Sequence, residues 1–189
     1  RILFVLFSIC CLSVFAQPPV HIVYNKNLSG KALDGRLLLL LSKSGASEPR
    51  FQIEDGPNSQ IVFGKDVDGW KGGEGISFKG AEFGYPVQSL KNVPAGEYYI
   101  QAVLHKYETF KRSDGHTVKM PMDRGEGQHW NMAPGNFLSK PVKVRFDPKS
   151  TKMISITLED SIPTIKEPED TKYIKHIKIQ SKLMKEFWG

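Results

Sequence analysis

The chain has 189 residues and a formal net charge of +6, with 24% charged and 40% hydrophobic residues. Its lysines are spread along the sequence instead of forming a basic stripe with interleaved aromatic side chains, so nucleic acid is not an expected partner. Both cysteines, Cys10 and Cys11, lie in an apolar N-terminal run. A packed core must therefore stabilise the rest of the chain, without disulfides or thiolate-bound metal.

Residues 1–16 have the pattern of a secretory signal peptide: an arginine, an apolar run over residues 2–15, and the small residue Ala16 at its end. The run is shorter than the roughly 20 residues that cross a bilayer, so no membrane span is expected. We expect cleavage near Ala16 and a secreted or periplasmic protein. A lipoprotein would need a lipidated Cys10 or Cys11, but the apolar run continues past both.

Short apolar runs, separated by Gly, Pro, Asn and Asp, are typical of an antiparallel all-β domain. Residues 20–24 are the first predicted strand, and residues 25–35 form a polar turn region. Residues 36–41 are apolar after the first position and predict a central strand covered on both faces. A helix is the alternative, but Gly35 and the polar residues 42–45 leave it too little room.

Three later segments alternate clearly between apolar and polar residues. Residues 141–146 and residues 153–158 do so, and the turn residues 147–150 between them predict a β-hairpin. Strands of this kind bury their apolar face against a second sheet, so we predict a β-sandwich. Residues 97–104 predict a long strand with Tyr98, Ile100, Ala102 and Leu104 on one face.

The intervening stretches, residues 51–91 and residues 105–140, are rich in Gly, Pro, Asp and aromatic residues and are predicted to be irregular loops. Loops of this length in a compact domain usually carry function or a docking surface. Residues 159–172 contain prolines and acidic residues without periodicity, which indicates a linker. Alternation resumes over residues 173–179, and Ser181 is a candidate cap of a short helix.

Nucleophilic catalysis finds little support in the sequence. A serine nucleophile of the α/β-hydrolase type needs a G-x-S-x-G turn, because small residues must flank the exposed serine. The chain has none, and residues 45–49 come nearest but lack the second glycine. A cysteine nucleophile is excluded after Ala16, since both cysteines precede it. No catalytic residue is therefore assigned.

A dense group of polar side chains falls in the second long loop. Imidazole and carboxylate groups bind divalent metals, but no pair here has the helical i, i+4 spacing or the C-x-x-C spacing of a zinc site. We therefore assign no metal and no cofactor. In the alternative interpretation, His116 and Asp123 make turn hydrogen bonds and His129 is solvated. The group comprises Asp114, His116, Asp123, Glu126 and His129.

Aromatic side chains in the loops are a second candidate for a binding site. A flat ring can stack on a sugar, so Trp70, Tyr85, Trp130 and Phe137 would suit a carbohydrate-binding module. Tryptophans in loops also plug the end of a sandwich or dock on a neighbouring domain. The sequence leaves both alternatives open.

Two motifs, HTVKMPMDRGEGQ at residues 116–128 and PGNFLS at residues 134–139, carry the densest part of a resemblance that covers residues 20–189. The chain resembles the N-terminal domain of secreted esterases related to enterochelin esterase and esterase D. In that family an Ig-like β-sandwich precedes an α/β-hydrolase domain, whose catalytic serine, acid and histidine would lie beyond Gly189. The other similar stretches are residues 34–36, 42–43, 48–51, 63–71, 84–86 and 94–104.

The resemblance implies an Ig-like antiparallel β-sandwich with long loops over residues 20–158, after the signal peptide of residues 1–16. It implies a linker over residues 159–172 and the start of a truncated α/β-hydrolase domain at residues 173–189. The chain would then be a non-catalytic accessory domain of a secreted esterase. Its partner would be its own C-terminal hydrolase domain, and its substrate would carry an ester or a glycan.

In this interpretation the second loop lines the substrate entrance or the surface that docks on the hydrolase domain, because long loops on a rigid scaffold make such contacts. The residues expected there are Asp114, His116, Asp123, Glu126, His129 and Trp130. The alternative function is a carbohydrate-binding module that uses Trp70, Tyr85 and Trp130.

Overall fold

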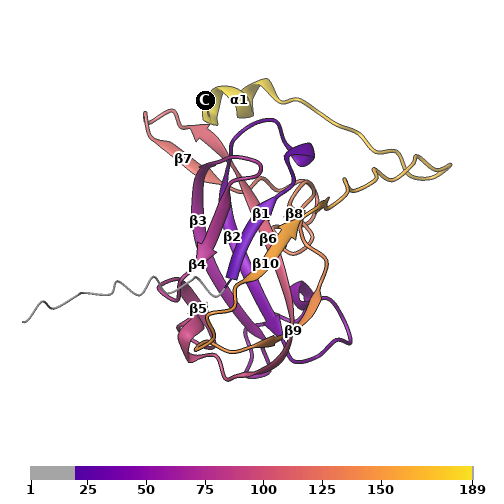
Figure 1. Ribbon diagram of the computed structural model, residues 1–189. Coiled ribbons are helices and arrows are strands. Elements are labelled where there is room, and N and C mark those ends of the chain that lie inside the picture. Colours follow the sequence, from indigo (N-terminus) through magenta and orange to yellow (C-terminus); the bar gives the residue numbers. More distant parts are fainter. Residues whose placement is uncertain (1–19, 189) are drawn as a thin grey trace, which may run out of the picture.

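Two β-sheets face each other across a shared core in the computed structural model, which describes residues 20–188 (Figure 1). Helix is rare in this part of the chain, so the all-β prediction is confirmed. The expected signal peptide at residues 1–16 lies outside the described residues. Among the helices of residues 20–188, none is long and apolar enough to span a bilayer. The helical elements are η1 (Lys26–Leu28), η2 (Pro49–Phe51), η3 (Leu90–Asn92) and α1 (Lys182–Trp188).

The smaller sheet has the strand order β10–β1–β4. It consists of β1 (Val20–Tyr24), β4 (Gly75–Phe78) and β10 (Ile154–Leu158), so the first predicted strand is confirmed. β1 runs antiparallel to β4 but parallel to β10. The sheets are therefore not wholly antiparallel as expected, because β10 reaches β1 by crossing from the other sheet instead of through a hairpin.

The larger sheet has the order β11–β8–β6–β2–β3–β5, and β7 and β9 also pair with β6. The long strand β6 pairs with β2 along one edge, while β9, β8 and β7 follow one another along its other edge. The strands are β2 (Leu33–Ser42), β3 (Ile61–Trp70), β5 (Phe83–Tyr85), β6 (Gly96–Lys111), β7 (Thr117–Met120), β8 (Phe137–Leu138), β9 (Val142–Phe146) and β11 (Asp160–Ser161).

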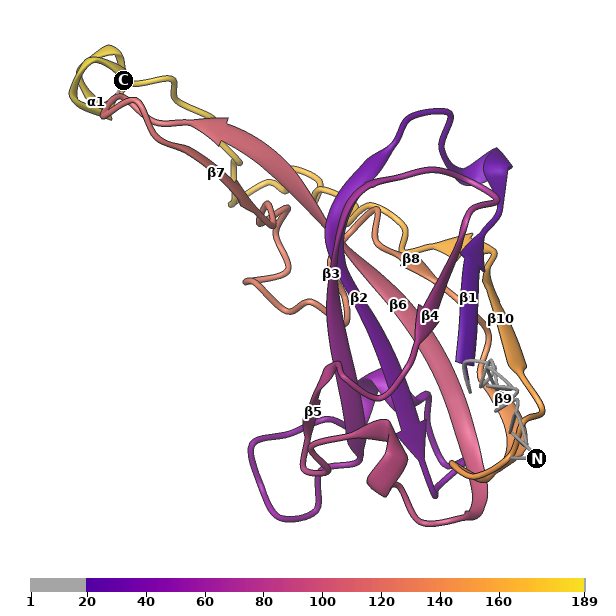
Figure 2. The ribbon, with the colours of Figure 1, turned by 60° about the vertical axis from the view of Figure 1, so that its left-hand side comes forward.

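The last part of β6 leaves the sandwich together with β7. Glu108 pairs with Met120 and Lys111 with Thr117, and the two strands form a two-stranded ribbon. We call residues 108–120 the β6–β7 ribbon. Figure 2 shows it projecting away from the two sheets.

The core fills the space between the sheets. Leu37, Leu39 and Leu41 of β2 are fully buried there and pack in one cluster with Ile22 and Phe78 of the smaller sheet. The predicted inward face of β6 is confirmed. Its four residues Tyr98, Ile100, Ala102 and Leu104 all belong to this cluster.

The opposite face of β2 is covered as well. We call this side of the larger sheet, turned away from the smaller sheet, the outer face. Leu38 and Leu40 pack there with Val103 of β6, under Trp130 and Ile53. The prediction of a central strand with two covered faces is therefore confirmed.

The hairpin predicted for residues 141–158 is wrong. β9 pairs with β6 in the larger sheet, whereas β10 pairs with β1 in the smaller one. The turn does reverse the chain, since Ser150 N donates to Asp147 O over 3.0 Å. Both strands must turn apolar side chains toward one core from opposite layers, so the chain changes sheets at this turn.

The loops predicted for residues 51–91 and 105–140 are wrong in part. The first contains β3, β4 and β5, and the second contains the end of β6 with β7 and β8. Lys65 interrupts the inward apolar face of β3 between Phe63 and Val67, yet pairing with β2 and β5 holds the segment as a strand. A Cβ at Gly64 would lie 2.7 Å from guanidinium nitrogens of Arg36, so this glycine makes room for a side chain of the neighbouring strand β2.

The segment after β11 differs from the sandwich. Ile162 still belongs to the body, because its carbonyl accepts from Gly135 N over 2.8 Å. We call residues 163–188 the C-terminal arm. The alternating residues 173–179 form no strand in it. The expected short helix is present as α1, and Ser181 Oγ accepts from Met184 N over 3.2 Å.

Candidate functional site

The polar residues singled out in the second loop do not converge on one site. Asp114 and His116 lie at the tip of the β6–β7 ribbon, where Asp114 binds Arg112 (Nη2 to Oδ2, 2.7 Å) and accepts from His116 N (3.1 Å). These side chains are largely exposed. Four residue pairs of the ribbon, roughly 10 Å of strand, separate the tip from the rest of the loop.

Asp123 and Glu126 hold the backbone of the following loop in shape. Asp123 Oδ1 accepts from Gly125 N at 2.8 Å and from Gly127 N at 3.3 Å, and both glycines have positive φ. Glu126 is only 7% exposed, and its Oε2 accepts from Arg124 N at 2.7 Å. The bonds of Asp123 are the turn hydrogen bonds expected for it in the alternative interpretation, whereas the bond of Glu126 was not predicted.

His129 and Trp130, at the end of this loop, have different environments. His129 is exposed, and its carbonyl accepts from Met132 N over 2.9 Å. The carbonyl of Trp130 accepts from Asn136 Nδ2 over 2.9 Å, while its ring packs on the outer-face cluster that includes Leu38. Of the six predicted residues, Trp130 is therefore the one that covers a sheet face.

No metal centre is evident in the part of the chain that the structure describes. Within residues 20–188, no group of three or more His, Cys, Asp or Glu side chains is placed to hold an ion.

The three aromatic residues of the alternative function lie on different sides of the larger sheet. Trp70 is 3% exposed in the core, edge-on to Tyr24 at 4.9 Å between ring centroids, and its Nε1 donates to Glu74 O over 3.0 Å. It plugs the sandwich and has no open face for a sugar. Tyr85, which is 43% exposed, stands opposite Val62 and so points to the outer face, as Trp130 does.

A histidine–serine contact was not predicted from the sequence. His21 Nδ1 lies 3.0 Å from Ser77 Oγ, and the two residues are direct neighbours on β1 and β4. Strand pairing alone brings such side chains within about 5 Å of each other. The contact is therefore explained by sheet register, and we assign it no catalytic role.

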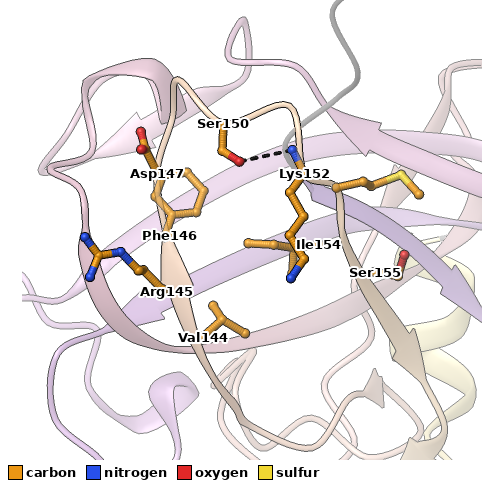
Figure 3. A pocket seen from close by; sticks show the side chains of 9 residues that line it. Val144, Arg145, Phe146, Asp147, Ser150, Lys152, Ile154 and Ser155 are labelled. Carbon is orange, nitrogen blue, oxygen red and sulfur yellow. Dashed lines mark hydrogen bonds between the residues drawn. The ribbon is translucent and has the colours of Figure 1, made fainter.

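One hollow opens at the seam between the sheets, beside β9 and β10. It measures about 590 Å³, and Val144, Phe146 and Ile154 contribute its apolar walls. Figure 3 shows Arg145 and Lys152 extending from its two sides and Ser150 bonded to Lys152 N, over 3.0 Å. This hollow marks where the chain crosses between layers, with one strand of each sheet on either side.

Another hollow lies on the outer face of the larger sheet, and we call it the outer-face pocket. It measures about 260 Å³ and is mostly apolar. Trp130 and Phe83 stand at its walls, and Phe83 is 74% exposed. The pocket is lined by Arg36, Leu38, Ile53, Val62, Gly64, Phe83, His105 and Trp130.

Two polar side chains of neighbouring strands meet in the outer-face pocket. Arg36 and His105 are paired residues of β2 and β6. Arg36 Nη1 binds Asp66 Oδ1 at 2.8 Å. Burial lowers the pKa of His105, and the nearby Glu126 carboxylate opposes this shift. Burial and the Asp66 carboxylate raise the pKa of the adjacent Tyr107, while Arg36 opposes the rise. At neutral pH the pocket thus presents one guanidinium and a neutral imidazole.

The sequence indicates Trp130 as a candidate site residue but not the residues that surround it in the pocket. Arg36 begins the leucine run, and Phe83 and His105 lie in or beside stretches predicted as loops. Arg36, Leu38 and Leu40 follow a period of two, which places them on one face of a strand. A charged residue on an otherwise apolar, covered face was the available signal. The partners on β3, β5 and β6 depend on sheet pairing.

No family model, curated protein or solved structure matches the chain.

Proposed function

We propose that the chain is the non-catalytic accessory sandwich of a secreted or periplasmic ester hydrolase, and that its C-terminal arm enters an α/β-hydrolase domain. The sequence resemblance suggests the enzyme class. The observation that carries the proposal is the exposure of the apolar side chains in the arm. Tyr173 is 85% exposed, Ile177 76% and Ile179 84%.

Such exposure is unusual for a segment with strand-like alternation. Burying a side chain of this size contributes about 1.5–3 kcal/mol. Three of them together would contribute roughly 6 kcal/mol to packing against another body. Contiguous exposed apolar side chains mark protein interaction sites. The arm thus has the composition of a strand that needs a neighbouring domain.

The position of the β6–β7 ribbon also supports docking of a further domain near the arm. Figures 1 and 2 both place α1 beside the tip of the ribbon, which carries Asp114 and His116. Met120 and Met122, at its base, are 47% and 39% exposed. Methionine adapts its shape to apolar partners. The ribbon and the arm together would form the surface that meets the hydrolase domain.

The Ig-like character of the sandwich is also part of the proposal. Tyr98 Oη donates to Pro94 O over 2.9 Å. A tyrosine whose hydroxyl bonds back to the backbone a few residues upstream is typical of Ig-like sandwiches. This contact favours the domain type that precedes the hydrolase in the resembled family.

The test uses the longer polypeptide that contains the catalytic domain. Ile179→Asp places a charge on the proposed docking strand. We expect it to lower ester hydrolysis several-fold, measured with p-nitrophenyl acetate, and to lower the melting temperature of the longer protein. In the 189-residue chain the same change should leave the melting temperature within about 2 °C, because the side chain is exposed there.

Gln180→Asp is the matched control, since it adds the same charge at the next exposed position. It should leave both proteins unchanged. Equal behaviour of the two variants in the longer protein would contradict the docking role. A longer protein that hydrolyses no ester would instead contradict the enzyme class.

A further inference from the structure

The outer-face pocket has walls suited to a flat apolar ring. Its floor consists of Leu38 and Val62, which are buried or half-buried on the central strands. Trp130 and Phe83 bound it, the first half-buried and the second largely exposed. Gly64 contributes no side chain, and the guanidinium of Arg36 lies against the position that a Cβ would take there. Aromatic and aliphatic surfaces of this kind favour stacking of a ring.

One side of the pocket carries hydrogen-bond donors. Asp66 engages Nη1 of Arg36, and the other two guanidinium nitrogens of Arg36 have no hydrogen-bond partner among residues 20–188. Nε and Nη2 lie beside Gly64, each 2.7 Å from where a Cβ would stand. No side-chain nitrogen without a partner is buried in residues 20–188, so Nε and Nη2 both keep contact with solvent. A guanidinium edge with two N–H groups matches the two oxygens of a carboxylate.

We propose that the outer-face pocket binds a small aromatic carboxylate, with its ring between Trp130 and Phe83 and its two oxygens on Nε and Nη2 of Arg36. His105 beside Arg36 is neutral at pH 7, so the guanidinium is the charged group that would hold the carboxylate. The net charge of +6 favours anions in general. This function is independent of the proposed hydrolase domain, because every residue of the pocket belongs to the sandwich.

The size and lining of the pocket decide between this ligand and a sugar. Pockets for drug-sized ligands measure roughly 300–1,000 Å³, so about 260 Å³ suits a ligand of one or two rings. A sugar presents hydroxyl groups around its whole rim. Here Leu38, Ile53 and Val62 would leave most of those hydroxyls unpaired, at a cost of about 1–3 kcal/mol for each buried group.

The experiment titrates the 189-residue chain with 2-naphthoate and with uncharged 2-naphthamide, followed by NMR chemical shifts and calorimetry. Hydrogen bonds to a charged group are worth about 1.5–3 kcal/mol. We therefore expect the carboxylate to bind at least about tenfold more tightly than the amide. Arg36→Met should remove this preference and leave amide binding within about twofold.

Phe83→Ala tests whether the Phe83 ring contributes to binding. It should leave the fold stable, because this side chain is 74% exposed. It should weaken both ligands several-fold, and Trp130→Ala should weaken them further. Tyr173→Ala removes an exposed aromatic side chain of the arm and should change nothing. Equal affinity of the unmodified chain for the two ligands, or no binding at millimolar concentration, would overturn the proposal. Displacement of 2-naphthoate by glucose or cello-oligosaccharides would overturn it in favour of a sugar site.

Discussion

The sandwich body and the C-terminal arm use the same residue types with opposite results. Tyr98 and Ile100 of β6 are each 1% exposed, whereas Tyr173 and Ile179 of the arm are 85% and 84% exposed. Both segments alternate or nearly alternate in sequence. The difference is that β6 has partner strands along both edges and a sheet across from it, and residues 173–179 have neither.

The comparison shows that an alternating pattern is a condition for a strand but not a sufficient one. A strand needs partners for its backbone groups and a second layer for its apolar face. Residues 173–179 would acquire both only in a further domain.

Truncating the same residue type in the two regions should separate them most clearly. Ile100→Ala opens a cavity in the core and should lower the free energy of unfolding by about 2–5 kcal/mol. Ile179→Ala should change it by no more than about 0.5 kcal/mol. Urea denaturation followed by tryptophan fluorescence measures both. Similar losses for the two variants would show that the arm packs on the body in solution.

Adding a methyl group should show how tightly the body is packed even at its edge strand. A Cβ at Gly84 of β5 would lie 2.3 Å from the Phe63 ring and 2.4 Å from Val87 O, so Gly84→Ala should cost about 1–3 kcal/mol. Gly30→Ala is the control, because nothing lies within 4 Å of its Cβ position. We expect a change within about 0.5 kcal/mol for the control. Thermal and urea unfolding of both variants provide the comparison, and a silent Gly84→Ala would contradict tight packing there.

The smallest change in the free energy of unfolding is expected for two carboxylates with lowered pKa values, Glu48 in the body and Glu167 in the arm. The Glu48 carboxylate accepts from Arg50 Nε at 2.7 Å and from the fully buried Gln101 Nε2 at 2.8 Å, and these bonds lower the pKa of Glu48. Glu48→Gln should lower the free energy of unfolding by about 1 kcal/mol at pH 7. The pKa of Glu167 is lowered by its exposed bond to Lys178 in the arm, and Glu167→Gln should leave unfolding of the sandwich unchanged.

The pH dependence of the Glu48 effect has a definite sign. A carboxyl with a depressed folded-state pKa stabilises the fold fully above its unfolded value, 4.5, and loses this contribution as the pH falls through the folded-state value. The difference between the native chain and Glu48→Gln should therefore shrink below about pH 4.5. Urea titrations between pH 3 and 7 measure it. A difference that grows on acidification would contradict this role of the ionised carboxylate.

Local sequence patterns predicted which segments form strands better than they predicted which strands pair. The leucine run of β2 and the alternation of β6 indicated buried strands, because those side chains dominate the local free energy. The sequence did not predict β3, because Lys65 interrupts its inward apolar face, and pairing with β2 compensates. The turn at residues 147–150 indicated a reversal but not which sheet the next strand joins. That choice depends on the position of β1, far away in the sequence.

The candidate site divides in the same way. Trp130 was found because a large aromatic side chain in a loop is visible in the sequence alone. Arg36, Phe83 and His105 come from three strands, and only their pairing with β3 and β2 brings them to one pocket. Asp123 and Glu126 were recognised as polar and clustered, but their partners are backbone N–H groups of their own loop.

Amino-acid composition and periodicity were enough to predict an all-β chain and a strand β2 covered on both faces, and residues 20–188 contain no cysteine for a disulfide. Composition and residue periodicity suffice for such properties, because they depend on what each segment must bury. The tertiary structure decided the parallel pairing of β1 with β10, the outer-face pocket and the exposure of the arm. These depend on contacts between residues distant in sequence, which a local pattern does not specify.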